Sequence, residues 1–174
     1  YDGISLAEVK SACKAAFAEQ QAHMDRIGNE GKRMLREAYA ADMPVIILAS
    51  RPYHADPEVC HGIDKLICDL GAAVITEDSV ADEIPKFEVN VLNQWTYHSR
   101  MYAAARYVAE NAREHPKLNL VQFVSFGCGV DAITTDEIRS ILESAGKIYT
   151  QIKIDEITNL GTVKIRLRSL FATM

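Results

Sequence analysis

Short apolar runs alternate with helix-like segments along most of this 174-residue sequence, and that alternation restricts the chain to few folds. The apolar runs occupy 44–49, 72–75, 118–125 and 147–154, and amphipathic patterns occupy 57–70, 95–112, 134–145 and 160–171. Strands that alternate with helices form parallel sheets with right-handed crossovers. We therefore predict an α/β three-layer sandwich of the Rossmann or flavodoxin type, with about four parallel strands and helices on both faces.

A long helical segment precedes the first apolar run. Ser5 and Glu8 form a capping-box pattern, and apolar residues follow at helical spacing to about residue 27. Gly28 and Gly31 weaken the pattern, so 30–41 either continues the helix or follows a bend. We predict a helical segment, 1–43, packed on an α/β domain, 44–174, as a single domain overall. The start at Tyr1, without an initiator methionine, suggests a fragment of a larger protein.

Composition excludes several classes of function. A formal net charge of -5 and a pI near 5.5 argue against a nucleic-acid partner, which requires a basic face. Apolar runs are too short to predict a membrane span. The cysteines lack paired CxxC spacing and a secretory leader, so we expect a cytoplasmic protein; they are Cys13, Cys60, Cys68 and Cys128.

The third apolar run leads into Gly127-Cys128-Gly129, which presents a cysteine between two glycines. The pattern of Thr134 and Glu137 predicts a capping box, so we expect the next helix to begin just after this loop. Cys128 would then lie at the carboxyl edge of the sheet near a helix N-terminus, an environment that favours a thiolate. The alternative is that Cys128 is a small buried hydrophobe in a tight turn.

Other loops at the same edge carry further candidates. His54 and Tyr53 are candidate catalytic residues, because both can exchange protons, although a loop histidine is more often structural. Arg51 and Asp131 are candidate cofactor-binding residues. Arg51 and Arg100 could bind a CoA phosphate or pair with an internal carboxylate, and we prefer the ion pair. We expect His98 to lie on a helix and to pack with Trp95 or Tyr102, which are near it in the sequence.

Several blocks of unusual residues occur in an order that resembles the CoA-substrate-specific enzyme activase family. The resemblance covers roughly 44–170. Its blocks are Arg51-Pro52-Tyr53-His54, Thr76-Glu77-Asp78-Ser79-Val80, Gln94-Trp95-Thr96-Tyr97-His98-Ser99-Arg100, Ser125-Phe126-Gly127-Cys128-Gly129-Val130-Asp131-Ala132, and Lys153-Ile154-Asp155-Glu156 with Asn159-Leu160-Gly161.

The resemblance implies a fusion of ATPase modules with a part similar to a 2-hydroxyacyl-CoA dehydratase subunit, in which α/β lobes share a 4Fe-4S iron-sulfur cluster. It implies electron transfer, an acyl-CoA substrate, and partner domains in the same polypeptide. By this analogy Cys128 is a cluster ligand. Because such clusters need three or four protein ligands, we expect the isolated chain to hold no cluster, to purify colourless and to be inactive.

Two other functions remain open. The chain could be a noncatalytic docking or scaffold domain of such a fusion. It could also bind NAD or FAD, because Gly127, Gly129 and Ala132 match a dinucleotide fingerprint and Asp155 follows at a suitable distance. Against the second, a helix that starts after Ala132 would exclude that residue from packing on the strand. A zinc site made from His54, Cys60, His61 and Cys128 lacks paired spacing.

Overall fold

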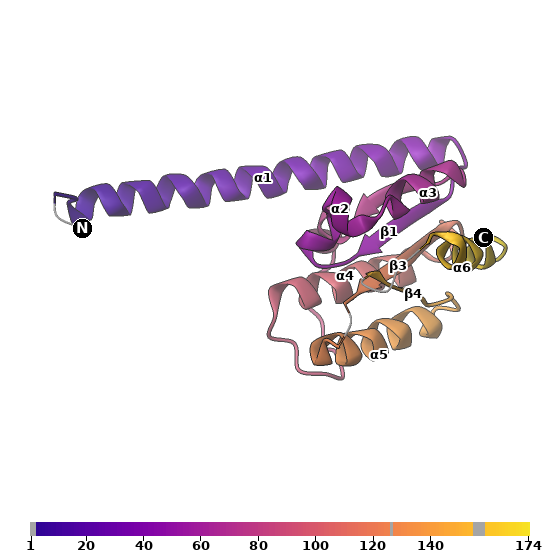
Figure 1. Ribbon diagram of the computed structural model, residues 1–174. Coiled ribbons are helices and arrows are strands. Elements are labelled where there is room, and N and C mark those ends of the chain that lie inside the picture. Colours follow the sequence, from indigo (N-terminus) through magenta and orange to yellow (C-terminus); the bar gives the residue numbers. More distant parts are fainter. Residues whose placement is uncertain (1–2, 126, 155–158) are drawn as a thin grey trace.

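The computed structural model describes residues 3–125, 127–154 and 159–174 (Figure 1). Within these ranges, four strands form one parallel sheet in the order β2-β1-β3-β4. The strands are β1 (Val45–Ala49), β2 (Ala73–Thr76), β3 (Leu118–Val124) and β4 (Thr150–Lys153). In the register of the sheet, Val45 lies beside Ala73 on one side and Leu118 on the other, and Val121 lies beside Thr150. The predicted α/β fold is confirmed.

Helices cover both faces of the sheet, as a parallel sheet requires. One face packs against α1 (Leu6–Ala40), α4 (Thr96–Asn111) and α5 (Gly129–Ser144). The other packs against α2 (Pro57–Cys60), α3 (Ile63–Asp69) and α6 (Gly161–Phe171). Successive residues of β3 alternate between the two cores, since Leu118 and Leu120 belong to the first and Val121 and Phe123 to the second.

The first helix, α1, is continuous for 35 residues, so the segment 30–41 continues it without a second start. Ser5 and Glu8 form the expected capping box, in which Glu8 N donates to Ser5 Oγ at 3.2 Å and Ser5 N donates to Glu8 Oε2 at 2.8 Å. Only the C-terminal half of α1 is buried against the sheet. Its N-terminal half extends beyond the rest of the chain (Figure 1).

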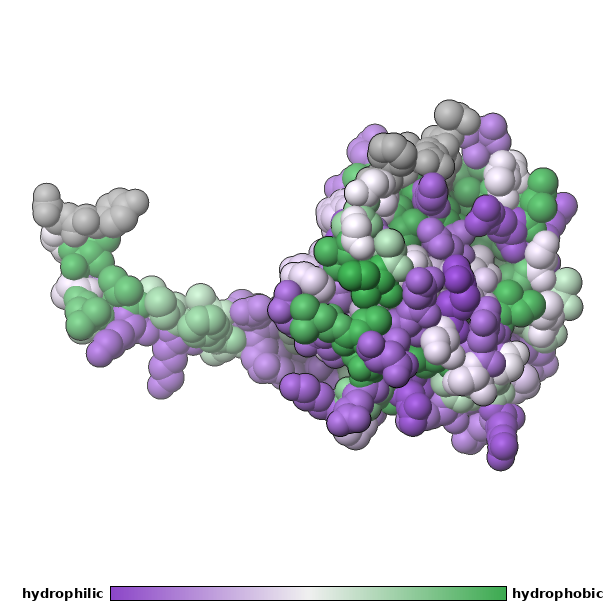
Figure 2. Space-filling view, turned by 90° about the horizontal axis from the view of Figure 1, so that it is seen from below, coloured by the Kyte–Doolittle hydropathy of each residue, from purple (hydrophilic) through white to green (hydrophobic). Residues whose placement is uncertain are grey.

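Hydrophobic side chains lie along this projecting half of α1 (Figure 2). Leu6, Val9 and Phe17 are exposed, and Phe17 retains 70% of its accessible surface. Large apolar side chains on a protruding helix are typical of a surface that contacts another protein region.

Two predicted helix boundaries are wrong. The helix expected over 57–70 is divided into α2 and α3, because His61 and Gly62 both adopt the left-handed conformation, with φ of 52° and 73°. The helix expected to begin after Thr134 begins six residues earlier, at Gly129. Glu137 forms no capping box there, since its carboxylate accepts a hydrogen bond from Asn90 N at 3.1 Å. Thr134 Oγ1 instead donates to Val130 O within the helix.

Short 3-10 turns connect the remaining elements near the carboxyl edge of the sheet. They are η1 (Pro52–Ala55) after β1, and η2 (Glu77–Ser79) and η3 (Ala81–Glu83) after β2. The C-terminal half of α1 lies very close to η2, where a Cβ atom added to Gly31 would meet Ser79 Cβ at 2.4 Å. Glycine is therefore required at this crossing by close packing.

Candidate functional site

The two loops that leave β1 and β3 meet at the point where the strand order reverses. The chain runs from β1 outward to β2 on one side and from β3 outward to β4 on the other, so β1 and β3 are central neighbours. In open α/β sheets, ligands bind in the crevice at such a switch point, at the carboxyl ends of the strands. We call the group formed here by Arg51, Tyr53, His54, Ser125, Cys128 and Asp131 the switch-point site.

Arg51 joins the two loops. Its Nη2 atom donates to a carboxylate oxygen of Asp131 and, at 2.9 Å, to the sulfur of Cys128. The arginine side chain is 17% exposed and the aspartate side chain 7%, so this ion pair is largely shielded from water. The preferred interpretation of Arg51 as part of an internal ion pair is confirmed. Removal of one partner would leave a poorly solvated charge, which is costly.

Asp131 uses its second oxygen to hold the end of β3. Its Oδ2 accepts a hydrogen bond from Ser125 N at 2.8 Å. Asp131 lies in the first turn of α5, where the helix dipole favours a negative charge. The same carboxylate therefore stabilises the helix N-terminus, the end of the strand and the arginine.

Ser125, a residue not predicted from the sequence as part of the site, connects the two candidate catalytic residues. Its Oγ atom lies 2.8 Å from His54 Nε2 and also forms a short hydrogen bond with Tyr53 OH. Arg51 Nη1 donates to the same tyrosine oxygen at 2.8 Å. His54 is fully buried, whereas Tyr53 is 47% exposed. The phenol thus presents the network to solvent, while the imidazole anchors it to the core.

Cys128 occupies the N-cap position of α5 and is half-buried. Gly127, immediately before it, has a φ of 68°, in the left-handed region that glycine favours. The side chain is therefore not enclosed in the core, and its sulfur lies beside the guanidinium of Arg51. All five site residues predicted from the sequence come together in one network.

Two further buried titratable groups, His98 and Glu77, lie near this network. His98 is 7% exposed, lies edge-on to the Trp95 ring at 5.7 Å, and has no hydrogen-bond partner on either ring nitrogen within the described chain. Burial lowers its pKa, and the charge of Arg51 lowers it further. Glu77 follows β2, and burial raises its pKa to about 7. The packing of His98 against Trp95 is as expected.

No other cysteine completes a metal site here. Cys60 is buried, donates weakly to Asp64 Oδ1 at 3.7 Å, and burial raises the pKa of its thiol. Cys13 and Cys68 are exposed on α1 and α3. Across 3–125, 127–154 and 159–174, no group of three or more His, Cys, Asp or Glu residues could hold a metal ion. The described residues therefore supply no complete set of protein ligands for a cubane cluster or a zinc ion.

The early start of α5, at Gly129, removes one reason against dinucleotide binding. Ala132 lies inside the helix, so the objection that this position falls outside it is wrong. However, Asp131 places a carboxylate in the first turn, close to where the fingerprint would hold a pyrophosphate, and like charges repel. Asp155, the acidic residue expected for the ribose, lies outside the described residues.

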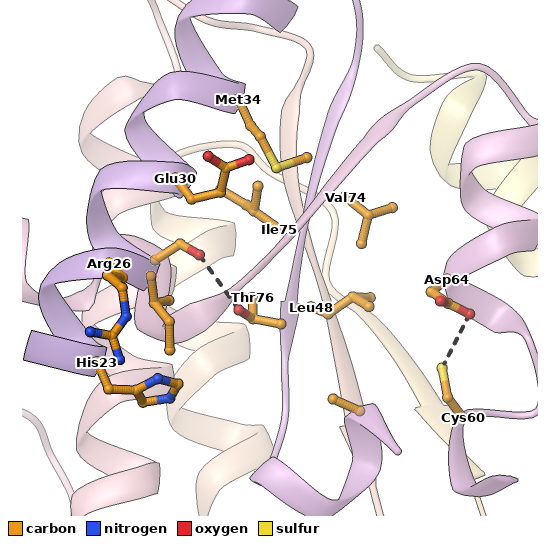
Figure 3. A pocket seen from close by; sticks show the side chains of 14 residues that line it. His23, Arg26, Glu30, Met34, Leu48, Cys60, Asp64, Val74, Ile75 and Thr76 are labelled. Carbon is orange, nitrogen blue, oxygen red and sulfur yellow. Dashed lines mark hydrogen bonds between the residues drawn. The ribbon is translucent and has the colours of Figure 1, made fainter. Parts of the chain in front are cut away.

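A separate pocket of about 560 Å³ lies between α1 and the α2–α3 segment (Figure 3). Leu48, Val74 and Ile75 supply aliphatic side chains from the sheet, and Met34 contributes from α1 (Figure 3). Cys60 and Asp64 lie on the opposite side and contact each other (Figure 3). None of the residues of the switch-point site lines this pocket.

Comparison with known families supports one part of the sequence interpretation. Residues 1–80 match the family described as CoA enzyme activase uncharacterised domain (DUF2229). The predicted relationship to the CoA enzyme activases is confirmed. The matched region includes Arg51, Tyr53 and His54 but ends before Cys128. The dehydratase-like part of the resemblance therefore stays a prediction.

No curated protein and no solved structure matches this chain significantly. Among the helices that the structure describes, none is both long and apolar enough to cross a membrane.

Proposed function

We propose that this activase-related chain is one lobe of an iron-sulfur-dependent, 2-hydroxyacyl-CoA dehydratase-like module, and that Cys128 contributes one cluster ligand from the edge of the sheet. The observation that carries the proposal is the position of Cys128. It lies half-buried at the switch point, between the carboxyl end of β3 and the N-terminus of α5.

The surroundings of Cys128 suit a ligand that carries negative charge. A cysteine binds metal as the thiolate, and hydrogen bonds to the sulfur tune the potential of an iron-sulfur cluster. The Arg51 guanidinium donates such a bond at 2.9 Å. When bound, a cluster supplies one-electron redox chemistry. Arg51, held by Asp131, would keep a positive charge beside the ligand sulfur.

Cys128 is the one thiol that the structure describes in the switch-point site, and this leads to a direct test of the proposal. One cysteine cannot satisfy a cubane cluster, so the remaining ligands must come from outside this chain. We expect the isolated chain to remain colourless after anaerobic incubation with ferrous iron and sulfide. A stoichiometric brown cluster with visible charge-transfer absorption in the isolated chain would overturn the shared-site proposal.

A docking role is the second candidate, and the projecting half of α1 favours it. Leu6 and Phe17 remain exposed on the part of α1 that extends beyond the rest of the chain (Figure 1). The two functions differ in their dependence on Cys128. In the full-length protein, Cys128→Ser should abolish reductive activity if the cysteine is a cluster ligand, and leave activity largely intact if the chain only joins other domains.

A further inference from the structure

A second pocket, of about 580 Å³, lies between the middle of α1, the segment 81–95 and the first turns of α4. Its apolar wall includes Met24, Phe87 and Trp95, and its polar wall includes Ser99 and Arg100. None of the residues of the switch-point site lines it. The lining of this cavity is more polar than apolar, and a concave site of this size with convergent polar groups beside aromatic side chains can hold a small polar molecule.

Arg100 is the main charged group of this pocket. It is half-buried, and it forms no ion pair with any residue that the structure describes. Its guanidinium donates a weak hydrogen bond from Nη2 to Met24 Sδ at 3.6 Å and lies 5.6 Å from the centre of the Tyr97 ring. The charge of Arg100 also reaches the buried Glu77 carboxyl, but the two groups form no salt bridge. The planar donors of the guanidinium match carboxylate and phosphate oxygens.

Other groups around Arg100 also favour a bound anion. Lys86 lines the pocket and adds a second positive charge, while Asp82 is the acidic residue of the lining. The N-terminus of α4 borders this pocket, and the side chain of its N-cap residue, Trp95, accepts no hydrogen bond from the first turn of the helix. Its first N–H groups therefore remain available to an acceptor. Asn93 Oδ1 is buried without a hydrogen-bond donor in the described residues, although it borders the same cavity.

We propose that this pocket binds a small molecule that carries an oxyanion, either a carboxylate or a phosphate ester, on an apolar or aromatic body. The oxyanion lies against Arg100 and the start of α4, and the apolar body lies against Phe87, Trp95 and Met24. The site is distinct from the switch-point site, and its test does not depend on the proposed cluster.

The chain contains a single tryptophan, so Trp95 fluorescence reports on this pocket directly. Phenyl phosphate and benzoate provide the two oxyanions on one aromatic ring, and inorganic phosphate provides the anion alone. We expect a saturable change in Trp95 emission with phenyl phosphate, benzoate or both, and a weaker response to inorganic phosphate. Tighter binding of phenyl phosphate would assign a phosphate ester, and tighter binding of benzoate would assign a carboxylate.

Removal of a positive or of a negative charge from the pocket tests whether its charge holds the oxyanion. Arg100→Gln should weaken binding about tenfold or more, because charge-assisted hydrogen bonds are lost. Asp82→Asn should strengthen binding severalfold, because it removes a like charge. Arg113→Gln is the matched control, since Arg113 is exposed beyond the far end of α4 and should leave binding unchanged. No saturable response to either aromatic probe, or equal binding by the Arg100 and Arg113 variants, would overturn the proposal.

Discussion

Replacement of Gly31 by alanine tests how tightly the C-terminal half of α1 packs on the rest of the chain. A Cβ atom at this position would lie 2.4 Å from Ser79 Cβ, 3.0 Å from Ser79 Oγ and 3.2 Å from Ser79 O. The first distance is far below van der Waals contact, so α1 or η2 would have to move. Gly28 lies one turn earlier on the same helix, and a Cβ atom there would meet nothing within 4 Å. It is the matched control.

Both substitutions gain helix propensity, but only Gly31→Ala adds an overpacked contact. Alanine stabilises a helix interior over glycine by about 0.5 to 1 kcal/mol. Overpacking of a close contact costs about 1 to 3 kcal/mol. We therefore expect Gly28→Ala to raise the free energy of unfolding by about 0.5 to 1 kcal/mol. Gly31→Ala should lower it by up to about 2.5 kcal/mol, which is the larger overpacking cost less the smaller gain in helix propensity.

Urea unfolding followed by circular dichroism measures both values on the same chain. The decisive quantity is the difference between the Gly28 and Gly31 variants, because helix propensity cancels in it. A difference of about 1 to 3 kcal/mol would support the close crossing of α1 and η2. Equal stabilisation by both substitutions would show that α1 does not pack closely on Ser79.

Two further predictions concern charges near the switch point. Arg51→Gln and Asp131→Asn should each lower the free energy of unfolding by about 3 kcal/mol, because each leaves a buried charge without its partner. The double variant should lose clearly less than the sum of the two single losses, because it contains neither charge. Additive losses in a urea double-mutant cycle would contradict the ion pair. Burial raises the pKa of Glu77 in the folded chain to about 7. The protonated carboxyl therefore contributes fully to stability below about pH 4.5, and this contribution is lost as pH rises through 7. The loss in the free energy of unfolding is at most about 3 kcal/mol. Urea midpoints between pH 4.5 and 8 should show this decline in the wild type and not in Glu77→Gln, and parallel profiles would refute it.

The strands were predictable because burial on both faces leaves a strong compositional signal. Val45–Ala49 and Leu118–Val124 are nearly continuous apolar runs, and both are fully buried strands. The start of α5 was not predictable from local pattern, because Glu137 is bound by Asn90, 47 residues away in the sequence. A capping-box pattern describes only local contacts, whereas here a tertiary hydrogen bond uses the carboxylate.

The site was predictable from the rule that parallel strands bring their following loops to one edge. That rule placed Arg51, Tyr53 and His54 beside Cys128 and Asp131, and the structure joins them. Ser125 was missed, because a serine after a strand carries no distinctive signal. Its role follows from the convergence of Tyr53 and His54 on one hydroxyl, which only the fold reveals.

The iron content of the full-length protein tests the assignment of Cys128 most directly. Cys128→Ser should lose bound iron and visible charge-transfer absorption, because a cluster ligand is removed from the edge of the sheet. Cys68→Ser is the matched control, since Cys68 is exposed on α3 and should retain both signals. Equal iron content and absorption in the two variants would contradict a cluster bound at the switch point.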